Sequence, residues 1–168
     1  MISDENQVNL GYLIRWEPKY EIGIPVVDSQ HKKLFMLCNN LHVALNNKDF
    51  GAGWENEFVY TLRQCVEYVK VHFKSEEILM RAAGFAGYEE HKKVHDSFIQ
   101  KVLEFSHEGN YSIGTAFKLL HFLYEWILSH IAHDDKLFVR SVLEYNRRRH
   151  ADKERVSTED SLFVVPEV

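Results

Sequence analysis

Histidine and carboxylate side chains recur in this chain at spacings that suit a metal site. His72 and Glu76 are four residues apart, as are His91 and His95, and on a helix residues at this spacing lie one above the other on a single face. Burying a carboxylate or a protonated imidazole is costly unless the group is paired or bound to a metal. Because imidazole nitrogens and carboxylate oxygens are common ligands of transition metals, the spacing predicts a metal site.

Two single histidines extend the candidate set. His31 lies one turn before the apolar stripe of its segment, and His130 continues the stripe of Leu123 and Ile127. A lone inward histidine is ordinarily a hydrogen-bonded core residue, but imidazoles on four helical segments disfavour that interpretation. Zinc is disfavoured because zinc sites are typically four-coordinate. The other histidines have no partner at ligand spacing and are interpreted as surface or interhelical residues: His42, His107, His121, His133 and His150.

Four segments with helical spacing of apolar residues would position these side chains. The first opens at Asp28, a good N-cap, and the second ends near Gly84. The third starts near Tyr88, and the fourth follows Ser112 and fades after Tyr145. Short connections favour antiparallel neighbours, so the predicted fold is all-α, an antiparallel up-down-up-down four-helix bundle. Its expected core residues include Val94, Phe98, Val102 and Phe105 in the third segment and Phe117, Leu120, Leu123, Ile127 and Leu137 in the fourth.

The predicted organisation is one bundle with two flanking pieces. Residues 1–27 contain aromatic residues without helical period and are expected to form an extended N-terminal arm packed on the bundle. Residues 28–150 are assigned to the bundle, because a chain of 168 residues suffices for one domain with a full core. Residues 151–168 are expected to form a flexible C-terminal tail or the start of a linker.

Four motifs resemble the hemerythrin family in their order and spacing. They are DSQHKKLF from Asp28, HFKSEEILM from His72, HKKVH from His91 and WILSHIAHDD from Trp126. The segment from Trp16 is similar to the family's N-terminal arm, and the resemblance extends to about Tyr145. A pattern of this many parts rarely arises by chance.

The resemblance implies a centre of two iron ions. By the family pattern one iron would be bound by His91, His95 and His130 and the other by His31 and His72, with Glu76 and Asp135 bridging both. Asp135 lies five residues after His130, about 140° around an ideal helix, whereas Asp134 lies closer to the face of His130. The choice of Asp135 therefore follows the family spacing and requires a locally irregular helix.

The function implied by the resemblance is reversible oxygen binding. Two carboxylates and a solvent-derived bridging oxygen would leave the two-histidine iron with an open position for O2. Trp126, Ile127 and Ile131 resemble the family's apolar residues around the oxygen, although ordinary core packing explains them equally. The chain has a single Glu-x-x-His spacing, Glu104 to His107, where oxygen-activating di-iron bundles use two. This favours oxygen storage, delivery or scavenging over enzyme activity.

Two other functions would use the same centre. An oxygen or redox sensor would signal to an effector domain or partner through the arm or the tail. An enzyme with peroxidase-like or nitric-oxide chemistry would turn over its substrate at the irons; the chain is expected not to be an enzyme, although weak peroxidase activity is compatible with such a centre.

Composition argues against several other classes. A formal net charge of −5 without a long basic stripe disfavours a nucleic-acid partner. The most apolar stretch, Phe122–Ala132, is too short to cross a membrane, and the acidic start of the chain is no secretory signal. Cys38 and Cys65 fit buried free thiols in a reducing compartment, so we expect a cytoplasmic protein.

Overall fold

The computed structural model describes residues 13–46, 53–107 and 111–162, and every regular element in these ranges is helical. The expectation of an all-α fold is therefore confirmed. The elements are η1 (Pro18–Tyr20), α1 (Pro25–Asn46), α2 (Gly53–Ala83), α3 (Tyr88–His107), α4 (Ile113–Trp126), the π-helix η2 (Ile127–Asp134) and α5 (Lys136–Leu162). No helix of this part of the chain is long and apolar enough to cross a membrane.

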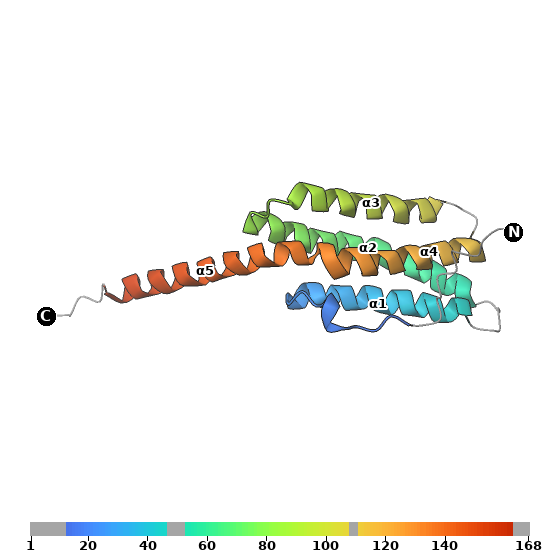
Figure 1. Ribbon diagram of the computed structural model, residues 1–168, viewed down its shortest axis with the longest axis horizontal. Helices are drawn as coiled ribbons and strands as arrows, with labels where there is room; N and C mark the ends of the chain where they lie inside the picture. Colours follow the sequence, from blue (N-terminus) through green and yellow to red (C-terminus); the bar gives the residue numbers. More distant parts are fainter. Residues whose placement is uncertain (1–12, 47–52, 108–110, 163–168) are drawn as a thin grey trace.

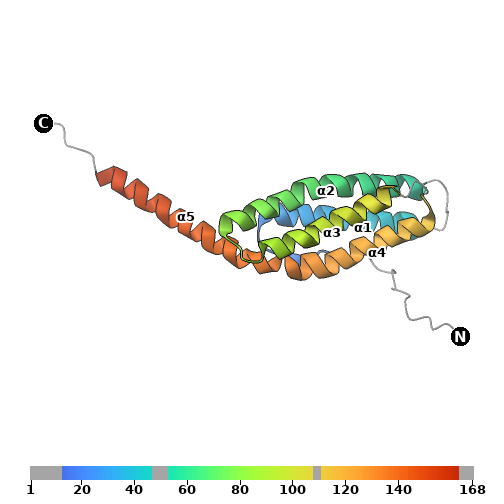
Figure 2. The same cartoon turned by 90° about the horizontal axis from the view of Figure 1, so that it is seen from above.

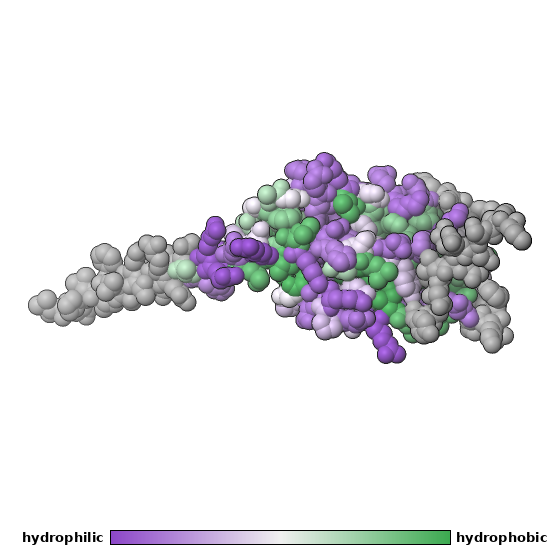
Figure 3. Space-filling model, viewed as in Figure 1, coloured by the Kyte–Doolittle hydropathy of each residue, from purple (hydrophilic) through white to green (hydrophobic). Residues whose placement is uncertain are grey.

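Helices α1 to α4 lie side by side, and the colour order in Figure 1 runs in opposite directions along successive helices. Helix α2 packs against both α1 and α3, while α4 packs against α1. The π-helix η2 joins α4 to α5, and α5 contacts α2 before it continues past the end of the other helices (Figures 1 and 2). The described part of α5 that leaves the bundle is hydrophilic on the face drawn in Figure 3.

Two apolar clusters hold the helices together. The larger one fills the middle of the bundle and includes the fully buried side chains of Leu41, Phe58 and Leu123. The smaller one includes Met80 and Phe138 and joins α5 to α2. Burying one large apolar side chain contributes about 1.5–3 kcal/mol, so these contacts account for the close packing of helices whose own propensity is modest.

The described part of the N-terminal segment lies along α1. The backbone N–H of Ile14 donates to Asn39 Oδ1 at 2.9 Å, and Asn39 Nδ2 donates to the carbonyl of Ile14 at 2.9 Å. The Trp16 ring meets Phe35 edge-on, with the ring centroids 5.2 Å apart. Residues 1–12 of the expected arm lie outside the described residues.

Helix α1 begins at Pro25, so the prediction that it opens at Asp28 was wrong. Proline suits the first turn of a helix because its missing N–H has no helical acceptor there. The Asp28 carboxylate instead accepts hydrogen bonds from the backbone N–H groups of Ile22, at 2.9 Å, and Gly23, at 3.1 Å. Gly23 has φ +77, which an L side chain rarely adopts. Asp28 therefore holds the loop that leads into the helix.

Two predicted core residues are exposed. Val94 is 38% exposed and Leu137 is 66% exposed, whereas Phe98, Val102 and Phe105 are buried as predicted. The error at Leu137 has a clear cause: the π-helix η2 accommodates one extra residue relative to a continuous α-helix, so every later inward position moves one residue along the chain. Phe138 is consequently the buried residue. Helix α5 also extends to Leu162 and does not fade after Tyr145.

Candidate metal centre

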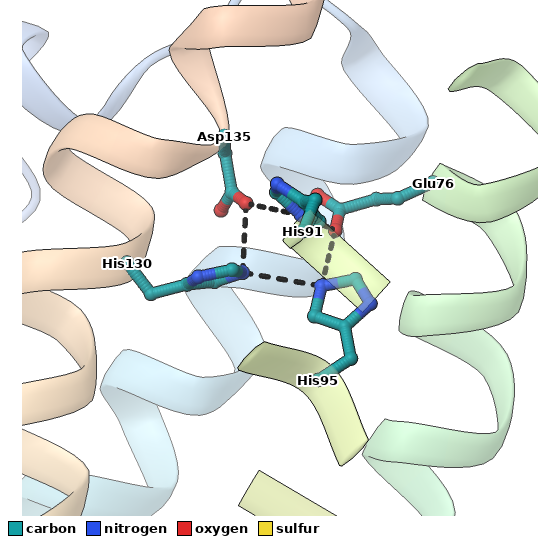
Figure 4. A group of neighbouring side chains, drawn as sticks. All are labelled: Glu76, His91, His95, His130 and Asp135. Carbon is teal, nitrogen blue, oxygen red and sulfur yellow. Dashed lines mark hydrogen bonds and ion pairs between the residues drawn. The ribbon is translucent and has the colours of Figure 1, made fainter. Parts of the chain in front are cut away.

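The structure brings the seven predicted ligand residues together in the interior, although they come from four separate helices and the residue after η2. All seven side chains are buried, and five of them are drawn in Figure 4, where they point toward one another. They are His31 from α1, His72 and Glu76 from α2, His91 and His95 from α3, His130 from η2 and Asp135 directly after η2.

The two oxygens of Glu76 face different histidines. Oε1 lies 3.7 Å from His31 Nε2 and 3.5 Å from His72 Nε2. Oε2 lies 3.6 Å from His91 Nε2 and 3.2 Å from His95 Nε2. One carboxylate therefore contacts a two-histidine group with one oxygen and a three-histidine group with the other.

Asp135 divides its oxygens in the same way. Oδ2 lies 3.1 Å from His31 Nε2. Oδ1 lies 3.4 Å from His91 Nε2 and 3.0 Å from His130 Nε2. The ligand atoms thus form two sets that share both carboxylates: one set adds His91, His95 and His130, and the other adds His31 and His72. This is the arrangement needed to hold two neighbouring cations bridged by carboxylates.

Most of the ligand atoms make no hydrogen bond to one another, although His95 Nε2 and His130 Nε2 lie at hydrogen-bond distance, 3.1 Å apart (Figure 4). Both oxygens of Glu76 and of Asp135 are buried without a hydrogen bond, and so is Nε2 of His31, His72 and His91. The ion-pair distances above are short enough for contact, but the angles are not those of hydrogen bonds. An unsatisfied buried polar atom costs about 1–3 kcal/mol, so a set this large fits bound metal ions, which would satisfy every one of these atoms.

The π-helix decides which aspartate enters the site. The backbone N–H of Asp135 donates to the carbonyl of His130 at 3.1 Å, a bond to the fifth residue back that brings Asp135 above His130. Asp134 lies outside the cluster, with Oδ2 3.2 Å from His130 Nδ1. Consecutive aspartates therefore contact opposite nitrogens of one imidazole. The local irregularity that the choice of Asp135 required is present.

Several residues that contact the outer ring nitrogens were missed by the sequence reasoning. Gln30 Oε1 lies 3.0 Å from His72 Nδ1, and Gln30 Nε2 donates to Ser75 Oγ at 3.3 Å. Glu77 Oε1 lies 3.6 Å from His95 Nδ1. The sequence offered one signal: Gln30, Glu77 and Asp134 are each the immediate neighbour of a predicted ligand.

Aromatic rings enclose the centre between the two apolar clusters. Phe73 stacks on His95 with centroids 3.8 Å apart, and Trp126 stacks on His130 at 4.0 Å. On the other side, Phe138 meets His91 edge-on at 5.8 Å. Of the predicted pocket residues, Trp126 thus contacts the site directly, while Ile127 and Ile131 are buried in the larger apolar cluster. The low-dielectric surroundings strengthen every charge interaction within the site.

Charge interactions in the metal-free site oppose the effect of burial. Burial lowers the pKa of His31, but contacts with Asp135 and Glu76 outweigh it and raise the pKa to about 9. Burial lowers the pKa of His72 to about 4. Burial favours a raised pKa for Glu76, yet the surrounding histidines hold it well below its usual range. Burial and Glu76 favour a raised pKa for Asp135, but His130 and His31 lower it. The carboxylates of Glu76 and Asp135 are therefore ionised at neutral pH, as ligands of a cation must be.

The remaining described histidines lie outside the cluster. His42 is buried beside Tyr124, with the ring centroids 6.4 Å apart. His121, His133 and His150 are exposed. The side chain of His107 lies outside the described residues.

The family profile of the hemerythrin HHE cation-binding domain matches residues 22–142. The chain belongs to the hemerythrin family. It is 34% identical over 129 residues to a bacteriohemerythrin of Pseudomonas aeruginosa (strain PAO1), covering 76% of this chain and 80% of the relative. It is 31% identical over 126 residues to a bacteriohemerythrin of Clostridium acetobutylicum, covering 74% and 97%.

A further relative and a solved structure agree with this assignment. A hemerythrin-like protein of Naegleria gruberi is 31% identical over 120 residues, covering 71% of this chain and 86% of the relative. A crystal structure of a hemerythrin point mutant superposes with a TM-score of 0.63 at 26% identity, covering 77% of this chain and 97% of that one. The match to a cation-binding family agrees with the ligand geometry found in the interior.

Proposed function

We propose that this chain holds two iron ions in its interior and binds O2 reversibly at one of them, for oxygen storage, delivery or scavenging. The observation that carries the proposal is the division of the Glu76 and Asp135 oxygens between a three-histidine and a two-histidine group. We propose further that the chain is an antiparallel up-down-up-down bundle with an N-terminal arm. The opposite directions of successive helices in Figure 1 support the antiparallel arrangement.

The two positions differ by one protein ligand. His91, His95 and His130 supply three nitrogens to one position, while His31 and His72 supply two to the other. With Glu76 and Asp135 shared, the two-histidine position would have one protein ligand fewer and would leave room for an exchangeable ligand. A pair of ferrous ions supplies redox chemistry that no side chain has, and the binding of a small neutral ligand such as O2 is the use proposed for it.

The protein's own residues orient the ligands and exclude water. Gln30 and Asp134 fix the ring orientations of His72 and His130 through their outer nitrogens. The rings of Phe73 and Trp126 cover the site on one side. A buried, preformed ligand set of this kind limits loss of the metal and limits access by larger, charged molecules.

The test is to load the reduced protein with ferrous iron without air, count the metal per chain and record the visible spectrum while O2 is admitted and withdrawn. We expect two irons and an absorption band that appears with O2 and disappears on its removal. His72→Ala should lose one iron and the band, whereas His121→Ala, which changes an exposed histidine on α4, should keep both. One iron per chain in the unaltered protein, or an unaffected His72→Ala variant, would overturn the proposal.

Sensing is a second candidate, and one observation favours it. Helix α5 begins at Lys136, directly after the buried Asp135, and extends past the end of the other helices (Figure 2). A change at the Asp135 carboxylate is therefore covalently linked to the projecting helix. We expect hydrogen exchange at residues 136–151 to differ between the reduced and the oxidised iron-loaded protein if the chain is a sensor, and equal exchange would remove this candidate.

Enzyme activity at the same centre is not part of the proposal. The side chains around the site are mainly apolar rings and metal-directed ligands, and one acid beside them is the buried phenol of Tyr68, which stacks on His72 with ring centroids 4.5 Å apart. Rapid turnover of hydrogen peroxide or nitric oxide by the iron-loaded protein would replace oxygen binding with an enzymatic function.

A further inference from the structure

We infer that the two metal positions are electronically unequal, because two imidazoles of the three-histidine group, His95 and His130, have a carboxylate near the outer nitrogen and neither imidazole of the two-histidine group does. The inference rests on the proposed di-iron centre. It assigns to Asp134, Glu77 and Gln30 a role that metal binding alone does not require: they determine which iron is oxidised first.

The three-histidine group has two acidic partners on its outer side. Asp134 Oδ2 lies 3.2 Å from His130 Nδ1, at hydrogen-bond distance. Glu77 Oε1 lies 3.6 Å from His95 Nδ1, within ion-pair range but without a hydrogen bond, so Asp134 is the carboxylate that can accept an outer N–H. The Asp134 side chain is 42% exposed, so solvent screens its long-range field, but its direct contact with the buried ring remains.

The two-histidine group has neutral surroundings on its outer side. His72 Nδ1 lies 3.0 Å from the amide oxygen of Gln30. Ser75 orients this amide, because Ser75 Oγ accepts from Gln30 Nε2 and itself donates to the Val71 carbonyl at 2.7 Å. His31 Nδ1 is buried without a hydrogen-bond partner. The two histidines of this position therefore have no carboxylate on their outer nitrogens.

This difference changes how strongly each imidazole donates its nitrogen lone pair to a metal. A carboxylate that accepts the outer N–H draws the proton away from the ring, which raises the basicity of the metal-bound nitrogen. An amide oxygen does so much less, because it carries no net charge. The three-histidine position is thus the better site for the more highly charged ion. When an outer-sphere oxidant such as ferricyanide removes one electron from the diferrous protein, the ferric ion is expected there, and the exchangeable position stays ferrous.

Azide tests the location of the ferric ion, because an anion binds well only to a ferric ion that has an exchangeable position. The decisive variant is the double change Asp134→Asn with Gln30→Glu, which moves the carboxylate from one group to the other and keeps the net charge. In the one-electron-oxidised state we expect azide to bind at least about tenfold more tightly to this variant than to the unaltered protein, in line with the 10–100-fold effects of such partners. The midpoint potential of the first oxidation should shift as well.

Two control variants make the same charge changes elsewhere. Asp96→Asn removes an exposed carboxylate on α3, and Gln100→Glu adds one on the same helix. Iron is counted first, so that failure to hold two irons in the unaltered protein counts against the proposed function itself. If two irons are present and the double variant matches the controls in azide affinity and potential, the inference is wrong.

Discussion

Replacing Asp135 by Asn in the metal-free protein tests the electrostatics of the site separately from metal binding. Asp135 is fully buried and contacts His31 Nε2 at 3.1 Å and His130 Nε2 at 3.0 Å. Asn has nearly the same shape but no charge, so the change removes the ion pairs without opening a cavity. The neighbouring Asp134→Asn provides a matched control at a half-exposed position.

The expected magnitude follows from the pKa of His31. Its rise from 6.5 to about 9 corresponds to about 3 kcal/mol of stabilisation by the two carboxylates. Asp135 contributes the larger part of this rise, but removing it also relieves its repulsion with Glu76. We therefore expect Asp135→Asn to lower the free energy of unfolding by about 2 kcal/mol, and Asp134→Asn by less than about 1 kcal/mol.

The pH dependence distinguishes this explanation from a general packing defect. Because the pKa of His31 is raised in the folded protein, the stabilisation is fully present below the unfolded value of about 6.5 and is lost as the pH rises through about 9. Urea unfolding followed by circular dichroism at pH 6.5 and pH 10 should show the cost of Asp135→Asn shrinking at the higher pH. An equal cost at both values would refute the assignment of the effect to an ion pair.

Three further predictions concern the core around the site. Phe138→Ala should lower the free energy of unfolding in urea by about 3–5 kcal/mol. Leu137→Ala, at the exposed neighbouring position, should change it by no more than about 0.5 kcal/mol. Similar losses for the two variants would contradict the one-residue shift after the π-helix. Ile131→Ala should change the autoxidation rate of the iron-loaded protein more than its iron content, and an unchanged rate would exclude this residue from the oxygen pocket. Because burial raises the pKa of Cys65 to about 12 and that of Cys38 further, a thiol reagent at pH 8 should label both only after unfolding; rapid native labelling would show an opening in the bundle.

Local spacing made much of the site predictable. The pairs His72–Glu76 and His91–His95 lie on single helices, where a separation of four residues places two side chains on one face regardless of what packs against it. Apolar periodicity likewise located α3 and its buried residues Phe98, Val102 and Phe105, because the core-facing side of a helix repeats at a fixed interval. The choice of Asp135 came from the family resemblance, since periodicity alone favours Asp134.

The helix ends and the region after the π-helix were less predictable. Asp28 has the residue type of an N-cap, but its carboxylate bonds to the loop before α1, a contact that depends on how that loop folds back. The extra residue in η2 exchanges Leu137 for Phe138 in the core. Sequence periodicity carries no direct sign of a π-turn, because the turn is stabilised by what its side chains contact in the folded protein.

The amino-acid sequence by itself determined that the chain is helical and that its metal-directed histidines share helical faces, because both properties depend on residues a few positions apart. Only the tertiary structure decided which oxygen of Glu76 or Asp135 faces which histidine, and that Gln30 on α1 contacts His72 on α2. Those contacts join atoms on different helices. Their distances are set by the packing of whole helices against one another, which no local spacing specifies.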